Sequence, residues 1–261
     1  AIEAVFSQHK FEAVLHFAAN IVVPESVANP LKYYSNNTRN TLNLLKMVER
    51  YQVPYMVFSS TAAVYGMPEQ TVLTEDLPLA PINPYGASKM MSERMMMDLA
   101  AASSLNYVIL RYFNVAGANP DGLLGQATPE ATHLIKVACE CVTGQRDGMS
   151  VFGTDYETRD GTCIRDYIHV EDLAKAHVMA LDYMAKGGES QVLNCGYGRG
   201  FTVREVIDVV KAESGVDFPV QETERRAGDP AALMADNTRI KSVLGWQPDF
   251  DDLNTIVRTA L

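Results

Sequence analysis

Asn83-Pro84-Tyr85-Gly86-Ala87-Ser88-Lys89 is the stretch that decides the fold, because it opens a helix between two apolar strands. Its asparagine is a favourable N-cap and its proline a favourable first helical residue, so we expect a helix over 84–103. Buried strands are expected on both sides of it, at 53–60 and 107–113. Strands joined by a helical crossover of this length form a parallel sheet, with helices covering both of its faces.

The same alternation of strands and helices runs through most of the chain. An apolar run at 13–19 predicts a buried strand whose small C-terminal residues permit close approach by a ligand. Thr202-Val203-Arg204-Glu205 is a capping box and predicts a helix start. The remaining elements expected are helices at 1–10, 31–51, Thr128-Pro129-Glu130 to Gly144, 171–186, 236–244 and 251–261, and strands at 149–152, 164–169 and 191–195.

This order of elements predicts an α/β fold, with a doubly wound, Rossmann-like parallel sheet and a smaller α/β lobe. The pattern loosens after Asn114, so we expect the chain to leave the sheet there and to cross back later. The predicted boundaries are 1–114 plus about 164–196 for the sheet domain, and 115–163 plus 197–261 for the second lobe.

The composition limits the partners. The 261 residues are 47% hydrophobic and 21% charged, as in a soluble globular protein. A net charge of −10 argues against nucleic acid or an anionic membrane surface as partner. We find no apolar run of about 18 residues and no signal-peptide pattern, so a cytoplasmic protein is expected. Cys139 and Cys141 point to different faces of a predicted helix, and the four cysteines predict neither a disulfide nor a metal site.

Tyr85 and Lys89 lie four residues apart, hence on one face of the predicted helix. An ammonium beside a phenol lowers the pKa of the tyrosine, which suits Tyr85 to proton transfer with a hydroxyl. A Tyr-x-x-x-Lys pair also occurs by chance on solvated helices, so the motif alone leaves catalysis open. His16, His169 and His177 share no metal-binding spacing and are expected in the core.

The first glycine of the chain is Gly66. A doubly wound dinucleotide domain opens with a strand and a glycine-rich turn, so we expect this chain to begin part-way into such a domain. Gly196-Tyr197-Gly198-Arg199-Gly200 has the spacing G-x-G-x-G rather than G-x-G-x-x-G, and it predicts a turn in the second lobe. We therefore expect turnover to require roughly 65 further upstream residues that supply the glycine turn.

With these residues in view, the sequence resembles the extended short-chain dehydrogenase/reductase family, and within it the UDP-glucose (UDP-galactose) 4-epimerases. The matching stretches span nearly the whole chain. They are Phe17-Ala18-Ala19, Pro24-Glu25-Ser26-Val27, residues 33–38, Phe58 to Gly66, Tyr85 to Lys89, Arg111-Tyr112-Phe113-Asn114, Asp160-Gly161-Thr162, Ile164 to Val170 and Arg225 to Asp229.

The resemblance implies NAD as cofactor and a UDP-sugar as substrate. It makes Tyr85 the base at the sugar 4-hydroxyl, Lys89 the group that lowers its pKa and holds the nicotinamide ribose, and Thr61 the hydroxyl at O4. The residues implied to line the NAD site are Phe17, Ala18, Ala19, Asn36, Ser59, Tyr85, Lys89 and Tyr112. Those implied to hold the UDP-sugar are Thr61, Tyr85, Asn114, Phe152, Arg165, Tyr167, Arg226 and Asp229.

The arginines also point to a diphosphate on chemical grounds. Guanidinium forks match phosphate oxygens bidentately, and Arg165 sits among apolar strand residues where a solvated role is awkward. Arg225 and Arg226 precede a turn with no helix face to serve. Surface ion pairs are the alternative for all three, and the choice is least decided for Arg225.

Among the reactions of this family, simple inversion at C4 fits the residues. Dehydratases carry a carboxylate directly after the Ser/Thr hydroxyl, where this chain has Ala62 and Ala63. GDP-sugar epimerase-reductases carry a cysteine where this chain has Thr61. The expected activity is NAD-dependent inversion of C4 of a UDP-hexose through a 4-keto intermediate.

Two alternatives remain open at this point. One is a UDP-glucuronate 4-epimerase or decarboxylase, or another nucleotide-sugar enzyme of the same family. The other is a protein that binds NAD or a nucleotide sugar without catalysis. The resemblance further implies a homodimer that pairs through the helices at 31–51 and 84–103.

Overall fold

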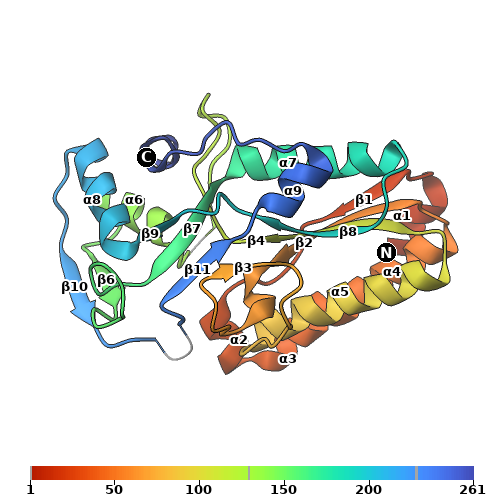
Figure 1. Ribbon diagram of the computed structural model, residues 1–261, viewed down its shortest axis with the longest axis horizontal. Helices are drawn as coiled ribbons and strands as arrows, with labels where there is room; N and C mark the ends of the chain where they lie inside the picture. Colours follow the sequence, from red (N-terminus) through yellow and green to blue (C-terminus); the bar gives the residue numbers. More distant parts are fainter. Residues whose placement is uncertain (1, 129, 227–228) are drawn as a thin grey trace.

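The computed structural model describes residues 2–128, 130–226 and 229–261. Its centre is a parallel four-stranded sheet in the order β1-β2-β4-β8. The strands are β1 (Ala13–His16), β2 (Tyr55–Thr61), β4 (Asn106–Tyr112) and β8 (Gln191–Cys195). Figure 1 shows α4 (Asn40–Arg50) and α5 (Pro84–Ala102) on one side of this sheet, and α7 (Val170–Ala185) and α9 (Thr238–Leu244) on the other. The predicted doubly wound parallel sheet is confirmed.

The central strand β2 is buried on both faces because neighbouring residues serve two different cores. Val57 packs into the core on the side of α7, with Ala176 among its members. Met56 and Phe58 pack on the opposite side with Leu45 of α4. This continuous burial explains why the strand reads as an apolar run, as is usual for parallel sheets.

The strand predicted at 13–19 is shorter and less buried than expected. It ends at His16, and it forms the edge of the sheet among the described residues, where β2 is the strand that pairs with it. Leu15 and Phe17 are exposed. A strand that is covered on one edge only keeps part of its apolar surface in contact with solvent.

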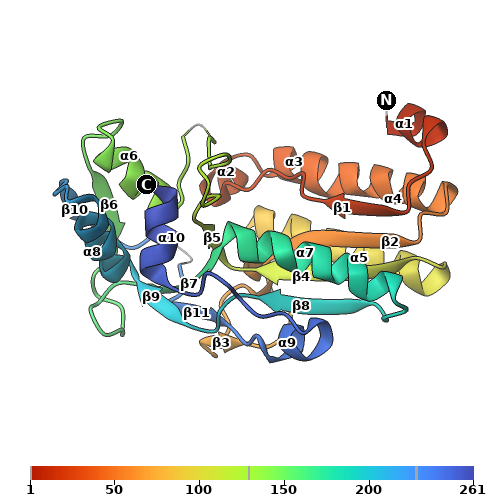
Figure 2. The ribbon, with the colours of Figure 1, turned by 90° about the horizontal axis from the view of Figure 1, so that it is seen from above.

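A second group of strands forms the start of the smaller lobe. β3 (Val72–Leu73), β11 (Ala232–Ala235), β7 (Ile164–His169) and β5 (Asn114–Ala116) lie side by side in that order, and β9 (Gly200–Thr202) pairs antiparallel with β7. A separate pair joins β10 (Val220–Thr223) to β6 (Met149–Phe152). Figure 2 shows α6 (Leu134–Val142), α8 (Val203–Ser214) and α10 (Leu253–Ala260) gathered at this end of the molecule.

The predicted domain boundaries remain a prediction. The topology places β7, assigned to the sheet domain, in the second group of strands. β3, from the N-terminal half, joins the same group. The short strands β3, β5, β9, β10 and β11 were not predicted, because two to four residues carry too little periodicity to detect.

Two helix predictions need correction. The helix expected from Thr128 begins at Leu134, six residues later, and Pro129 lies outside the described residues. The helix expected over 31–51 divides into α3 (Pro30–Tyr33), a π-helical turn η1 (Tyr34–Arg39) and α4. Such π turns are frequent at functional sites, and this one brings the buried Asn37 side chain against Ser88 of α5. α1 (Ile2–Gln8) agrees with the predicted N-terminal helix, while α2 (Val23–Ala28) was not predicted.

Both predicted local motifs of the second lobe are present. The Thr202 side chain accepts from Glu205 N at 3.1 Å, and the Glu205 carboxylate accepts from Thr202 N, which completes the capping box. The glycine run forms a turn between β8 and β9. The N–H groups of Tyr197 and Gly198 both donate to the Asp166 carboxylate at 2.9 Å, so this turn binds a side chain of the protein itself.

Across the described ranges, no helix is long and apolar enough to cross a membrane. The same ranges contain no group of three or more His, Cys, Asp or Glu side chains arranged to hold a metal ion. All four cysteines are buried and free.

Candidate active site

Tyr85, Lys89 and Thr61 lie in the interior of the molecule. They are 8%, 3% and 9% exposed, respectively. Tyr85 and Lys89 come from the first turns of α5, and Thr61 is the last residue of β2. Because α5 packs on β2, the helix start is held at the carboxyl end of the sheet, where ligands bind in doubly wound folds.

The start of α5 is fixed by contacts that the sequence encodes locally. The Asn83 side chain accepts from Gly86 N at 2.9 Å, as predicted for an N-cap. Gly86 allows the helix to touch the short 3₁₀ helix after β2, since a Cβ there would lie 2.5 Å from Ala63 O. From the other side, Asn37 Nδ2 donates to Ser88 Oγ at 3.0 Å.

Thr61 has two hydrogen-bonding roles. Its hydroxyl oxygen accepts from Ala63 N at 3.1 Å and so caps the 3₁₀ helix Ala62–Tyr65. The same hydroxyl lies close enough to the Tyr85 phenol to lower the pKa of that group. Thr61 therefore connects the strand end to the phenol.

Lys89 holds its charge against the end of β2. Its Nζ donates to Ser59 O at 2.7 Å and lies 4.8 Å from the centroid of the Phe58 ring. Burial lowers the pKa of Lys89 to about 8, and the charge of Glu93 opposes that shift. A cation held over an aromatic ring and beside a carboxylate remains charged at neutral pH.

The predicted lowering of the Tyr85 pKa is not found in the protein itself. Burial raises the pKa of Tyr85. The neighbouring phenols of Tyr112 and Tyr33 raise the Tyr85 pKa further, and the Thr61 hydroxyl lowers it. Lys89 does not offset burial because its ammonium donates to the Ser59 carbonyl. The shared helix face was read correctly, but it did not determine where the ammonium points.

Three of the residues expected to bind NAD, Phe17, Ser59 and Tyr112, lie around the His177 ring. His177 Nδ1 lies 2.8 Å from Leu173 O, a contact that makes it the donor, so Nε2 accepts from the Ser59 hydroxyl at 2.7 Å. The Phe17 ring lies 4.7 Å and the Tyr112 ring 6.4 Å from the His177 ring, centroid to centroid.

The other predicted NAD contacts lie at the same end of the sheet. Ala18 and Ala19 follow β1 directly. Asn36 Nδ2 donates to Asn37 Oδ1 at 3.0 Å, and Asn37 in turn bonds both N–H and C=O of Asn20. The π turn therefore uses Asn37 for structure and leaves Asn36 partly exposed at the edge of the site.

These residues fit the nicotinamide and ribose half of NAD. Lys89 carries three N–H donors, and Ser59 O is its hydrogen-bond acceptor among the described residues. His16 Nδ1 is buried beside it and has no hydrogen-bond partner in the same part of the chain. Buried polar atoms of this kind suit a polar ligand with hydroxyl groups.

Apart from Thr61 and Tyr85, the residues expected to hold the UDP-sugar lie on or near the strands β5, β6, β7 and β11. Asn114 and Tyr167 are opposite each other in the β5–β7 pair. Arg165, on the same strand, lies 3.4 Å from Asp229, and Arg226 stacks over the Phe152 ring at 3.7 Å. Ala227 and Gly228, part of the stretch that carried the family resemblance, lie outside the described residues.

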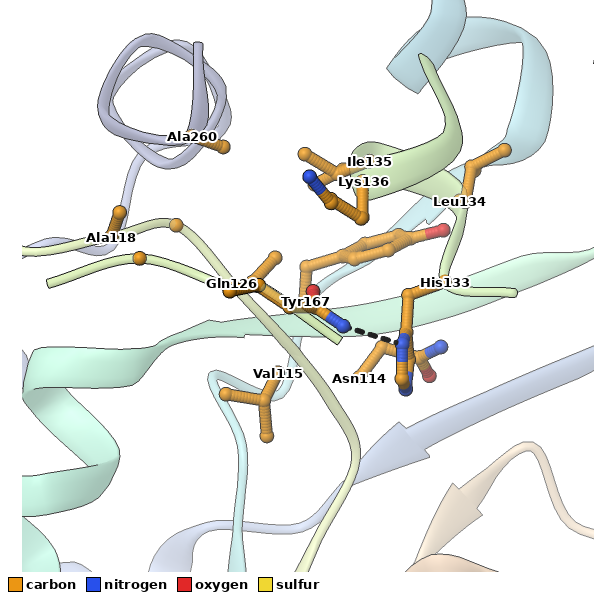
Figure 3. A pocket seen from close by; sticks show the side chains of 14 residues that line it. Asn114, Val115, Ala118, Gln126, His133, Leu134, Ile135, Lys136, Tyr167 and Ala260 are labelled. Atoms are coloured by element: carbon orange, nitrogen blue, oxygen red, sulfur yellow. Dashed lines mark hydrogen bonds between the residues drawn. The ribbon is translucent and has the colours of Figure 1, made fainter. Parts of the chain in front are cut away.

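A cavity of about 350 Å³ lies beside Asn114 and Tyr167. Figure 3 shows Tyr167 crossing it, with the hydrogen bond between Gln126 and His133 on one side. Leu134 and Lys136 of α6 also line it. Sequence reasoning missed these α6 residues because no motif marks them as ligand-binding. None of Tyr85, Lys89 and Thr61 lines this cavity.

A buried ion pair beneath the site was also missed. Arg111 Nη2 lies 2.6 Å from Glu93 Oε2, and the Ser60 hydroxyl donates to the same carboxylate. Arg111 Nη1 donates to Tyr65 OH at 3.1 Å, and Tyr65 donates to Asn194 Oδ1 at 2.7 Å. The available signal was a charged residue in the middle of each buried element.

Comparisons with known proteins agree with this geometry. The chain matches the family described as NAD dependent epimerase/dehydratase family over residues 1–196. A UDP-glucose 4-epimerase from Azospirillum brasilense is 57% identical over 260 residues, covering 100% of this chain and 75% of that relative. The crystal structure of UDP-glucose 4-epimerase from Brucella ovis in complex with NAD superposes with a TM-score of 0.96 at 44% identity, covering 99% of this chain and 80% of that one. The Bifidobacterium longum UDP-glucose 4-epimerase in complex with NAD⁺ and UDP gives 0.93 at 39% identity, covering 100% and 78%.

Proposed function

Because this chain belongs to the NAD dependent epimerase/dehydratase family, we propose that it uses NAD to invert C4 of a UDP-hexose. The observation that carries the proposal is the burial of Tyr85, Thr61 and Lys89 together at the carboxyl end of the sheet. The relatives named as UDP-glucose 4-epimerases favour this activity over the uronic-acid and non-catalytic alternatives.

In the proposed reaction, bound NAD accepts hydride from C4 of the sugar and returns it to the opposite face. Tyr85 takes the proton of the 4-hydroxyl as the 4-keto sugar forms and gives it back when the ring is reduced. Thr61 lies beside the phenol, lowers its pKa and is placed to guide that proton. Lys89 supplies the positive charge that favours the phenolate once a ligand draws its ammonium away from Ser59 O.

The second lobe is proposed to hold the nucleotide. The cavity beside Asn114 and Tyr167 lies within the size range of small-molecule sites. Arg165 and Arg226 supply guanidinium groups for the diphosphate. The nucleotide is anchored while the hexose is held loosely. The 4-keto sugar can therefore rotate and present its other face before it is reduced, which inversion requires.

Two further features are proposed. A homodimer through helices 31–51 and 84–103 is supported by exposed apolar side chains on them: Leu31 (73% exposed), Leu42 and Met91. A cytoplasmic location is supported by four buried cysteines that remain free thiols, as in a reducing compartment. The division into an NAD-binding domain and a nucleotide-sugar lobe is likewise proposed with the boundaries given above.

Substituting Tyr85→Phe tests the assignment. The protein is expected to lose C4 inversion by 10²-fold or more, about the contribution of a positioned acid–base group. Conversion of UDP-galactose to UDP-glucose is followed with NAD present, and Tyr51→Phe serves as the control. A Tyr85→Phe protein that retains more than a small fraction of the rate refutes the role.

A further inference from the structure

His177, in the middle of α7, has a buried imidazole that the proposed mechanism does not use. The residue is 1% exposed. Its Nδ1 lies 2.8 Å from Leu173 O, an atom that can only accept, so Nδ1 carries the ring hydrogen. Nε2 is then the acceptor for the Ser59 hydroxyl at 2.7 Å. Both ring nitrogens are satisfied in the neutral imidazole, which fixes the orientation of the ring.

Ser59 connects this imidazole to the active-site lysine. Its hydroxyl bonds His177, on the α7 side of the sheet, while its backbone carbonyl accepts from Lys89 Nζ at 2.7 Å. Lys89 belongs to α5, which covers the opposite side of the sheet (Figure 1). A two-step link therefore runs from α7 through β2 to the ammonium.

The backbone of Ser59 depends on this link because strand pairing holds only one of its edges. The pairing of β2 with β1 ends at Phe58, one residue earlier, whereas the pairing with β4 continues to Thr61. On the β1 edge, the Ser59 carbonyl bonds the Lys89 ammonium instead. The hydrogen bond to His177 therefore supplies a second restraint on the residue that accepts from Lys89.

We propose that His177 is a positioning residue for the Lys89 ammonium and acts through Ser59. The hydrogen bond to Nε2 holds the Ser59 carbonyl at the place where the ammonium waits for ligand. The catalytic consequence rests on the proposed function, in which Lys89 supplies positive charge as the Tyr85 phenol takes its proton. A displacement of about 1 Å at a reacting group can cost on the order of 100-fold in rate, so a restraint on this carbonyl matters.

Two substitutions at position 177 separate the two ring nitrogens. The side-chain amide of His177→Gln reaches the place of Nε2 and can accept from the Ser59 hydroxyl. The shorter amide of His177→Asn reaches only the place of Nδ1, so it can keep the contact with Leu173 O but loses Ser59. Ser59→Ala removes the same hydrogen bond from its other end.

The position of the ammonium is followed by NMR in protein labelled with ¹³C at the lysine Cε atoms, without added NAD. The Lys89 resonance is the one missing from the spectrum of Lys89→Met. We expect His177→Asn and Ser59→Ala to shift this resonance and His177→Gln to leave it close to its original position. Ser190→Ala is the control, because the Ser190 hydroxyl donates to Asn106 Oδ1 at 2.8 Å, far along the chain from this link. It should lower Tm without moving the resonance.

The catalytic consequence is measured with NAD and UDP-galactose. We expect His177→Asn to lower kcat about 10- to 100-fold and to leave KM for UDP-galactose unchanged, since the ammonium acts at the phenol and not on the nucleotide. His177→Gln should recover most of the lost kcat. Equal losses in both variants would mean that the ring acts by packing alone, which overturns the inference.

The remaining outcomes keep this inference separate from the proposed function. A Lys89 resonance that stays in place in His177→Asn and Ser59→Ala refutes the positioning role. Should His177→Asn fail to fold, Ser59→Ala decides by the same resonance. A shifted resonance with unchanged kcat refutes the catalytic consequence. An unsubstituted protein that inverts no UDP-galactose with NAD refutes the proposed function, and the resonance still decides whether His177 holds the ammonium.

Discussion

Lys89 keeps a positive charge inside the protein, and its surroundings explain how. Its ammonium bonds a backbone carbonyl, faces the Phe58 ring and lies near Glu93. These three contacts do not fully compensate for the hydration that the ammonium loses. Burial therefore lowers the pKa of Lys89 to about 8. A buried ammonium of this kind lowers the stability of the fold, and its place in the protein is explained by its role in the proposed reaction.

Replacing this lysine with an apolar side chain should therefore stabilise the fold while removing activity. Lys89→Met is expected to raise the free energy of unfolding by about 1 kcal/mol at pH 7, because buried charges are often replaced favourably and Glu93 keeps Arg111 as partner. Urea unfolding measures the difference. A variant that is less stable than the original protein would show that the ammonium stabilises the fold.

The same pair of proteins has a defined pH dependence. The pKa of Lys89 is about 8 in the folded state and 10.5 in a free lysine side chain, so the unfolded chain binds more protons between these values. The penalty of the buried charge is full below pH 8 and disappears as pH rises to 10.5. The advantage of Lys89→Met should accordingly shrink across this window, and an advantage that stays constant would contradict the assignment.

At the scale of elements, the start of α5 fixes the position of Tyr85 relative to Thr61. The Asn83 cap begins the helix, and Gly86 lets it contact the 3₁₀ helix that follows Thr61. The distance between phenol and threonine hydroxyl thus depends on how closely these two backbones approach.

Gly86→Ala tests this close approach. Alanine ordinarily favours a helix over glycine by about 1 kcal/mol, but here the added Cβ would lie 2.5 Å from Ala63 O. Because the clash is with backbone, we expect a net loss of about 1–3 kcal/mol and a lower kcat. Ala101→Gly, exposed in the last turn of α5, is the control and should change stability by less than 1 kcal/mol without changing kcat. A Gly86→Ala protein that is more stable than the original would show that α5 and the 3₁₀ helix can move apart to make room for the added Cβ.

Across the whole molecule, the Glu93–Arg111 pair joins parts that are distant in sequence. It links α5 to β4, and through Tyr65 it reaches Asn194 of β8. Both charged side chains are buried, at 1% and 4% exposure. A pair of this kind holds helix and sheet in one arrangement, although its net contribution to stability can be small.

Breaking the pair from one side should cost far more than removing both charges. Glu93→Gln is expected to destabilise the protein by about 3–5 kcal/mol, because Arg111 then remains buried without a carboxylate. In the double variant Glu93→Leu with Arg111→Met, most of that loss should be recovered. Chemical unfolding of Glu93→Leu, of Arg111→Met and of the double variant that combines them gives the coupling energy. Losses that simply add would mean that the two side chains act independently.

Several local features of the fold could be predicted from the sequence. The Asn83 cap, the capping box at Thr202 and strand β8 were all placed correctly. Each depends on groups a few residues apart, so the chain itself carries the whole signal. The motifs around Tyr85 and Thr61 likewise indicated the family.

Other features depend on contacts that no local pattern contains. Ser59 meets His177 across 118 residues, and Asn194 meets Tyr65 across 129. The direction of the Lys89 ammonium and the raised pKa of Tyr85 both follow from such contacts. The sequence alone determined the helix starts at Asn83 and Thr202 and the longer strands of the parallel sheet. Only the tertiary structure decided which buried polar groups find partners, because desolvation and hydrogen bonding depend on what the fold brings alongside.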